Sequence, residues 1–204
     1  MSLPPTIHPD PVLTEASPEA EVKERLAAGD RASVWELVVQ AYGAEIYGFV
    51  VAVLDDGFEA EDIYAGVCNR VAADLPSFAW TCALRTWAYG IARKELAARG
   101  RAAPGRVGGS RTLHELPDPT STVSFRPIES RARMTVLRRR LPREDRVLLV
   151  LRIARSFDWP DIAKIAIGWD ANALDLAREA RRLRARMAEL RSVLARAAEE
   201  LVTR

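Results

Sequence analysis

Apolar residues recur at intervals of three and four along most of this chain, which is the spacing of one face of an α-helix. The stretch 58–71, FEAEDIYAGVCNRV, is typical: Ile63, Val67 and Val71 fall on one face, and acidic residues crowd its start. No segment alternates apolar and polar residues over a convincing length, as a half-buried strand would. The pattern therefore predicts an all-α protein.

Capping and turn residues divide the first hundred residues into four predicted helices. Pro18 stands in a first turn and Gly29 is a stop signal, while Asp30 can cap the helix that follows. The fourth helix presents an apolar side that includes Leu84, Trp87 and Ile91. The predicted helices cover residues 17–29, 30–54, 58–74 and 81–99.

The composition changes at residues 102–128, which are rich in Gly, Pro, Ser and Thr and lack helical periodicity. This stretch is too long for an ordinary loop inside one compact domain, so we expect a flexible linker. It separates a first helical domain, 17–101, from a second, 129–204. We expect residues 1–16 to form a disordered tail.

Two helices open the second predicted domain. One extends to about Arg140, and the next lies within LPREDRVLLVLRIARSF, residues 141–157. Apolar spacing predicts that this second helix buries Val147, Leu148, Leu151 and Ile153.

The segment that begins at Asp158 has the outline of a helix-turn-helix. Asp158 caps a short helix in DWPDIAKIAIGW that ends at Gly168, and a second, arginine-rich helix begins near Ala171. In this last helix apolar residues follow steps of four and three, which predicts a heptad seam of about three and a half repeats. The seam residues are Leu176, Ala180, Leu183, Met187, Leu190, Leu194, Ala197 and Leu201.

Charge differs between the two halves. Residues 1–128 carry 12 Lys and Arg against 17 Asp and Glu, whereas residues 129–204 carry 18 against 11. A basic half joined to an acidic half suggests an anionic partner, and nucleic acid is the first candidate.

The chain offers little to support catalysis, a cofactor or a metal. It has no Gly-rich phosphate loop, no metal-ligand spacing and no plausible pair of nucleophile and base. Cys68 and Cys82 form no CxxC pair, and nothing at the N-terminus suggests secretion. The longest apolar run, about 46–54, is far short of the roughly 20 residues of a membrane span. We expect a cytoplasmic protein without membrane insertion.

Three stretches together resemble the extracytoplasmic-function (group IV) sigma factors of bacterial RNA polymerase. They are AEDIYAGVCNRVAADLPSF (60–78), RTWAYGIARKELAARGR (85–101) and, after the linker, LPREDRVLLVLRIARSFDWPDIAKIA (141–166). The resemblance covers roughly residues 30–101 and 129–187. It implies a first domain that docks on the polymerase clamp and melts the minus-ten promoter element, and a helix-turn-helix domain that reads the minus-thirty-five element. The partners it implies are core RNA polymerase and promoter DNA.

The resemblance also implies roles for individual residues. Asp62 falls where the family shows an acid toward the clamp, so with Glu61 and Tyr64 it forms the expected polymerase-binding set; the alternative for Asp62 is a helix-terminal charge. Trp87 matches the family's aromatic minus-ten helix, where a ring can stack on unpaired bases, but its apolar spacing fits a core position about equally well. We expect the cations of the last helix to be free to meet phosphates. The expected DNA-binding residues are Arg85, Trp87, Arg93, Lys94, Lys164, Asn172, Arg178, Arg181, Arg182 and Arg186.

The chain also departs from the family pattern. Ala65 and Cys68 replace the usual Gln and Phe of the clamp-binding helix, and Lys94 and Ala98 stand where an Asn and a nearby Asp are common. Acids that repel phosphate accompany the arginines and can pair with them in neighbouring turns: Asp170, Asp175 and Glu179.

Two hypotheses follow from this mixture of resemblance and departure. The leading one is a transcription initiation factor that binds polymerase and DNA. The other is a sigma-like interaction protein that lacks promoter recognition and sequesters a regulator through its acidic half or its C-terminal seam. An anti-sigma factor as a further partner, and self-association through the last helix, stay open.

Overall fold

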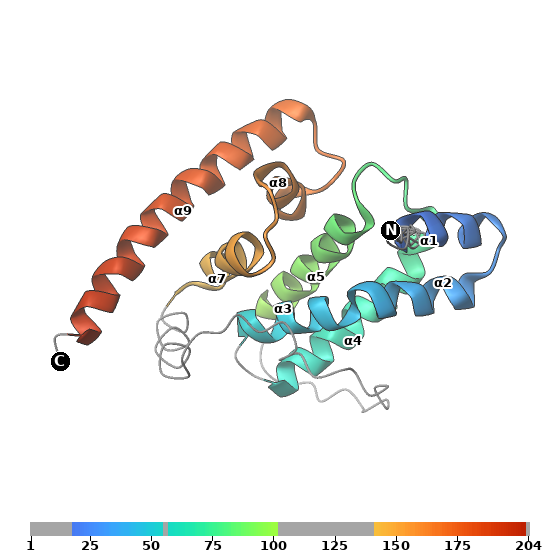
Figure 1. Ribbon diagram of the computed structural model, residues 1–204, viewed down its shortest axis with the longest axis horizontal. Helices are drawn as coiled ribbons and strands as arrows, with labels where there is room; N and C mark the ends of the chain where they lie inside the picture. The colour runs from blue at the N-terminus through green and yellow to red at the C-terminus, as the bar shows by residue number, and fades with distance from the viewer. Residues whose placement is uncertain (1–17, 55–56, 102–140, 203–204) are drawn as a thin grey trace, which may run out of the picture.

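A computed structural model describes residues 18–54, 57–101 and 141–202 (Figure 1). Within these ranges the regular elements are all helical and no strand occurs, which confirms the all-α prediction. The expected tail 1–16, the expected linker 102–128 and the expected helix that ends near Arg140 lie outside the described residues.

The first half forms the four helices that the sequence predicts. Asp30 caps the second of them, because its Oδ1 accepts a hydrogen bond from the backbone N–H of Ser33 at 3.2 Å. One π-helical turn, Val39–Gly43, interrupts the predicted helix 30–54 without breaking it. The elements are α1 (Pro18–Ala27), α2 (Arg31–Val38), α3 (Ala44–Leu54), α4 (Gly57–Asp74) and α5 (Leu84–Arg101).

The core of this half lies where α3, α4 and α5 meet. Phe49 of α3 and Ile63 of α4 are at most 2% exposed. The apolar side predicted for α5 is confirmed, because Leu84, Trp87 and Ile91 are all buried. Helices of this length depend on such tertiary packing for most of their stability.

The second half contains α7 (Arg143–Leu149), a π-helical turn (Val150–Ala154), α8 (Trp159–Ile167) and α9 (Ala173–Val202). Asp158 caps α8 by accepting a hydrogen bond from the N–H of Asp161 at 2.9 Å, as predicted. Gly168 ends α8 with φ at +113°, a backbone conformation that favours glycine.

The heptad seam of α9 is confirmed as its buried face. Leu183, Met187 and Leu190 are at most 8% exposed, and the seam residues on either side are half-buried as far as Ala197. The seam packs on α8 and α7 (Figure 1). By contrast, the prediction that Ile153 is buried is wrong, since it is 60% exposed. Ile153 lies in the π-helical turn, where a wider repeat shifts each side chain from its α-helical direction.

One stretch of the described chain, Ser33–Leu54, is long and apolar enough to cross a membrane by length and composition. The sequence did not suggest this stretch as a membrane span, because polar residues divide its apolar run. Its Phe49, Val50 and Val53 are fully buried against the rest of the protein. A core helix passes the same test, so this stretch is weak evidence for a membrane span.

The two halves are packed together. Helix α5 lies against α8, and α3 lies against α7 (Figure 1). Aromatic rings join them: Tyr89 of α5 contacts Phe157 at a centroid distance of 4.8 Å, and Trp87 contacts Trp169 at 6.2 Å. This contact between the halves determines how the candidate residues of α5 are presented.

Candidate functional site

Trp87, the expected base-stacking residue of α5, lies in the core. It is 2% exposed, and its ring stacks on Phe78 at a centroid distance of 4.7 Å while its edge meets Trp169. The sequence left two settings open for Trp87, a core position and a position that faces DNA, and the structure shows the core position. In this arrangement the ring cannot receive an unpaired base.

Arg85, at the start of α5, is bound on several sides. Its guanidinium pairs with Glu45 of α3, donates to the carbonyl oxygen of Arg155 at 2.9 Å and lies 4.1 Å from the ring centroid of Phe157. Burial, the largest single effect, would lower the pKa of Arg85, but the hydrogen bonds to Glu45 together with charge attraction to Glu45 and two tyrosines raise this pKa above its ordinary value. Arg85 therefore links α3, α5 and the segment that precedes α8.

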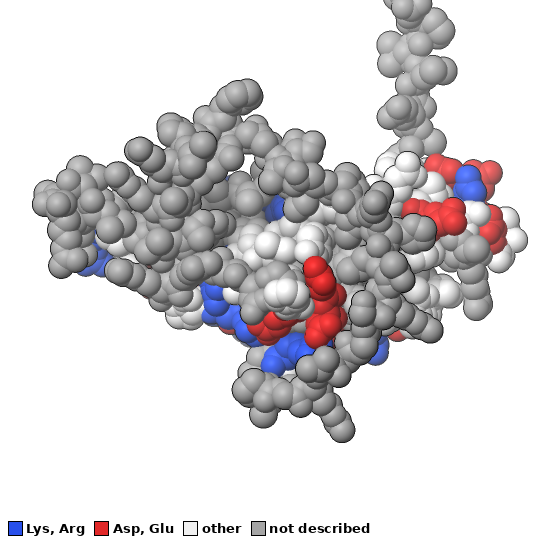
Figure 2. Space-filling view, turned by 90° about the horizontal axis from the view of Figure 1, so that it is seen from below, with Lys and Arg blue, Asp and Glu red and all other residues white. Residues whose placement is uncertain are grey.

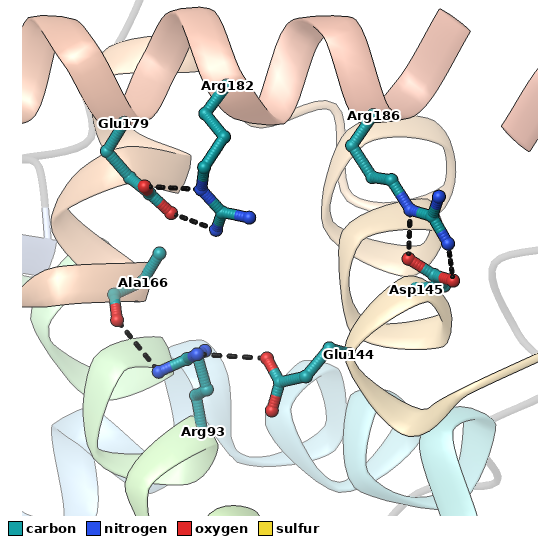
Figure 3. Close-up of polar contacts among 7 residues, drawn as sticks. All are labelled: Arg93, Glu144, Asp145, Ala166, Glu179, Arg182 and Arg186. Carbon is teal, nitrogen blue, oxygen red and sulfur yellow. Dashed lines mark hydrogen bonds and ion pairs between the residues drawn. The ribbon is translucent and has the colours of Figure 1, made fainter. Parts of the chain in front are cut away.

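Arg93, two turns further along α5, bridges α7 and α8 (Figure 3). Its Nη1 donates to the carbonyl oxygen of Ala166 at 2.8 Å, and its Nη2 donates to Glu144 Oε2 at 2.9 Å. Ala166 lies in the last turn of α8, where carbonyl oxygens lack helical partners and carry partial negative charge. Arg93 thus caps the C-terminus of α8. The neighbouring Lys94 is exposed, with its Nζ 4.1 Å from the ring centroid of Trp169.

The expected polymerase-binding residues have three different settings on α4. Glu61 is exposed, whereas Asp62 is half-exposed and accepts a hydrogen bond from Arg99 Nη2 at 3.3 Å. Tyr64 is buried, with its ring edge against Tyr47, and burial raises the pKa of its hydroxyl. Glu61 and Asp62 are accessible to a partner in this arrangement, and Tyr64 is not.

The helix-turn-helix candidates outside the arginines serve the local fold. Lys164 of α8 lies 3.6 Å from Asp161, one turn earlier. Asn172 precedes α9, and its Oδ1 accepts a hydrogen bond from the N–H of Asp175 at 2.9 Å, as an N-cap does. The Asn172 side chain is exposed, so its amide remains at the surface.

Two arginines of α9 pair with acids one turn away. Arg178 lies 3.6 Å from Asp175, and Arg182 donates to both carboxylate oxygens of Glu179 at 2.7 and 2.5 Å (Figure 3). The hydrogen bonds from Arg182 lower the pKa of Glu179 below its ordinary value. The predicted pairing of acids with the arginine face is therefore confirmed for these two arginines, and their contact with phosphate stays a prediction.

Arg186 is also paired, but with a distant part of the chain. It forms two hydrogen bonds to Asp145 of α7, at 2.9 and 2.6 Å, and a third to Glu189 (Figure 3). The Asp145 side chain is only 8% exposed, so the carboxylate is buried where this pair connects α9 to α7. Arg181 differs from the others: its side chain is exposed and donates to the backbone oxygen of Ala177.

On the coloured part of the face in Figure 2, Lys and Arg lie beside Asp and Glu near the centre and do not form one basic patch. Among the residues that the structure describes, no group of His, Cys, Asp and Glu could hold a metal ion.

The sequence did not identify several residues that determine this site. Glu45 binds Arg85 within the first half. Glu144 and Trp169 contact α5 candidates from the second half. The sequence positions of these three residues give no sign of such contacts. Gly90 did carry a signal, since a glycine inside a helix often marks a close approach. A Cβ atom at Gly90 would lie 2.9 Å from Trp169 Cζ3.

No protein-family model matches the chain. It is similar to the RNA polymerase sigma-H factor of Pseudomonas aeruginosa (strain PAO1), with 27% identity over 178 residues, covering 79% of this chain and 91% of that protein. An alignment of that extent includes residues from both halves. The similarity supports a sigma factor family for this all-α chain.

Proposed function

We propose that this protein is a transcription initiation factor of the extracytoplasmic-function type, which binds core RNA polymerase and directs it to specific promoters. The observation that carries the proposal is the similarity to a sigma factor over most of both chains. The helix pair α8–α9, with its tight turn at Gly168, adds a geometry suited to DNA. The protein then acts in the cytoplasm without chemistry of its own.

In this proposal residues 17–101 form the polymerase-binding domain and 129–204 the DNA-reading domain. Glu61 and Asp62 are the accessible part of the polymerase-binding set. Arg178, Arg181 and Arg182 are the accessible cations of α9, because their own side chains are exposed and their partners lie within one turn of the same helix.

The decisive experiment is capture of core RNA polymerase by the purified full-length protein, followed by transcription from a library of promoter sequences. We expect stable capture and initiation at a subset of promoters. A protein that binds neither the core enzyme nor promoter DNA in its presence would contradict the proposal.

A second function, a sigma-like interaction protein without promoter recognition, has one specific observation in its favour. Three arginines of α9 and both arginines of α5 discussed above are bound to acids or carbonyl groups of the same chain. Capture of polymerase without promoter selectivity would favour this function.

A further inference from the structure

A cavity of about 290 Å³ lies where α5, α7, α8 and α9 meet, and the proposed function makes no use of it. Its volume is at the lower edge of the roughly 300–1,000 Å³ of small-molecule sites, so a ligand that fits it must be small. Both apolar and charged side chains line it. In small-molecule sites the apolar side chains hold the body of a ligand, and a few charged or polar groups fix its orientation.

The apolar lining of the cavity comes from three helices. Leu148 of α7, Ile165 of α8 and Leu183 of α9 belong to it, and each is at most 8% exposed. Where these side chains border the cavity, they lack the neighbouring atoms that a filled core would supply. An alkyl group in this space would gain those contacts and would leave water. The lining therefore favours a ligand with an apolar body.

The charged groups around the cavity are nearly balanced in sign. They are the guanidinium groups of Arg93, Arg182 and Arg186 and the carboxylates of Glu144, Asp145 and Glu179 (Figure 3). A balanced set gives little preference to an ion of one sign, because attraction by one member is offset by repulsion from its partner. Such a set favours a ligand that carries both charges.

Two of these groups keep bonding capacity within the described part of the chain. Arg182 uses Nε and Nη2 for Glu179, while its Nη1 makes no hydrogen bond to a described residue. Glu144 uses Oε2 for Arg93, while its Oε1 makes no hydrogen bond to a described residue. One guanidinium N–H and one carboxylate oxygen match the carboxylate and the ammonium group of a zwitterion.

Arg182 and Glu144 are also near enough to influence each other. The hydrogen bond to Glu179 raises the pKa of Arg182 most, and charge attraction to Glu144 adds a smaller rise. Charge attraction falls with distance and is screened by water, so these two groups are close neighbours. A single small ligand can therefore reach both of them.

We propose that this cavity binds a zwitterionic α-amino acid with an apolar side chain. The carboxylate of the ligand accepts a hydrogen bond from Arg182 Nη1, and its ammonium group donates to Glu144. Its side chain packs on the apolar lining described above. The inference goes beyond the proposed function and does not depend on it.

The test titrates the full-length protein with L-leucine and L-phenylalanine, followed by calorimetry and by thermal unfolding. Two analogues of leucine each lack one charge: isocaproate has no ammonium group, and isoamylamine has no carboxylate. Glycine lacks the apolar side chain. We expect saturable binding of both amino acids, with a rise in Tm of about 5–10 °C at a hundred times the Kd. Glycine and both analogues should bind about tenfold more weakly or worse than leucine.

Two charge variants test the assigned contacts. Glu144→Gln removes the partner of the ammonium group, and Arg182→Gln removes the partner of the carboxylate. Both side chains are more than 60% exposed, so we expect both variants to fold. Each should weaken leucine binding about tenfold. Glu144→Gln should leave the affinity for isocaproate unchanged, and Arg182→Gln should leave the affinity for isoamylamine unchanged.

Glu189→Gln is the matched control. It makes the same substitution as Glu144→Gln at a carboxylate that is 65% exposed and lies 2.8 Å from an arginine, but Glu189 does not line the cavity. This control should bind leucine as the wild type does. Ala166→Leu places a larger side chain in the lining and should abolish binding. Circular dichroism reports whether each variant keeps its helices, and the charge variants decide the proposal if Ala166→Leu does not fold.

The absence of saturable binding of both amino acids to the wild type would overturn the proposal. Equal affinity for leucine and for either analogue would do the same, because a zwitterion would then not be required. Leucine binding that is unchanged in both charge variants would place the ligand elsewhere and would also overturn it. Capture of core polymerase is measured separately, so failure of this site leaves the proposed function standing.

Discussion

Helices α5 and α9 both present arginines, but in opposite situations. On α5, Arg85 and Arg93 bind groups 40 or more positions away in the sequence, and the aromatic residues between them are buried. On α9, Arg178 and Arg182 bind acids three residues away, and their side chains are 66% exposed. A local pair opens by rotation of one side chain, whereas the bonds of Arg93 to α7 and α8 open only when one half of the molecule moves. Arginine side chains on α9 are therefore accessible to a partner, whereas those of Arg85 and Arg93 on α5 are not.

The largest effect we predict separates a buried position on α5 from an exposed one on α9. Trp87→Ala should lower the free energy of unfolding by about 3–5 kcal/mol, because it removes a buried indole and leaves a cavity. Arg181→Ala, the exposed comparison, should change it by no more than about 0.5 kcal/mol. Urea unfolding followed by circular dichroism measures both. Equal stability of Trp87→Ala and wild type would mean that Trp87 is not a core residue.

The second prediction concerns Cys82, which lies in the segment just before α5. Burial raises the pKa of its thiol to about 11 from an ordinary 9.0, with smaller effects from Lys164 and Asp161 of α8 and from Glu19. At pH 8 this shift lowers the thiolate fraction about a hundredfold, so alkylation should be slow and should accelerate as pH rises toward 11. Alkylation rates measured by mass spectrometry, with free cysteine as reference, provide the test.

Gly90→Ala extends the alkylation test of Cys82. If separation of the halves exposes Cys82, the thiol of Cys82 should react faster in this variant at pH 8. Cys68, which is hydrogen-bonded to Tyr64 within α4, should keep its rate. Alkylation of Cys82 at the rate of free cysteine in the wild type would contradict its half-buried setting.

The third prediction tests whether exposed arginines of α9 meet phosphate. In a complex with core polymerase, Arg181→Ala/Arg182→Ala should reduce the salt dependence of promoter binding by about 1.8 in log–log slope, about 0.9 for each lost contact. Arg196→Ala, further along the same helix, serves as the control. If the double variant binds and transcribes like wild type, these arginines form only a solvated surface and the interaction-protein function becomes the better one.

A small effect on folding is expected at Asp62. Its partner Arg99 belongs to α5, yet this pair lies within one half and both side chains are about 40% exposed. Asp62→Ala should cost at most about 1 kcal/mol of stability and should weaken binding of core polymerase. Asp74→Ala removes a comparable exposed pair, with Arg70, and is the control. Unchanged affinity in Asp62→Ala would leave Asp62 with only its pair to Arg99.

Local patterns in the sequence predicted most of the fold. Caps such as Asp30 and Asp158 and the seam of α9 depend on neighbours within four residues, so spacing and residue type define them. Ile153 was misplaced because nothing in its spacing announces a π-helical turn.

The candidate site was harder to predict, because its partners come from distant parts of the chain. Composition identified the arginines, and helical spacing anticipated the pairs of Arg178 and Arg182. The partners of Arg93 and Arg186 lie 51 and 41 positions away and depend on how the halves meet. Trp87 shows the same limit: periodicity alone left its core and surface settings equally open.

The 30 residues of α9 also make it a lever. At about 1.5 Å per residue the helix is about 45 Å long, and its first turns lie next to the contact with α5. A rotation of about 10° at that end would carry the other end through about 8 Å. The pair of Arg186 with Asp145 forces α7 to follow the same rotation. A small rotation at the contact with α5 would therefore become a displacement, at the far end of α9, larger than one turn of helix.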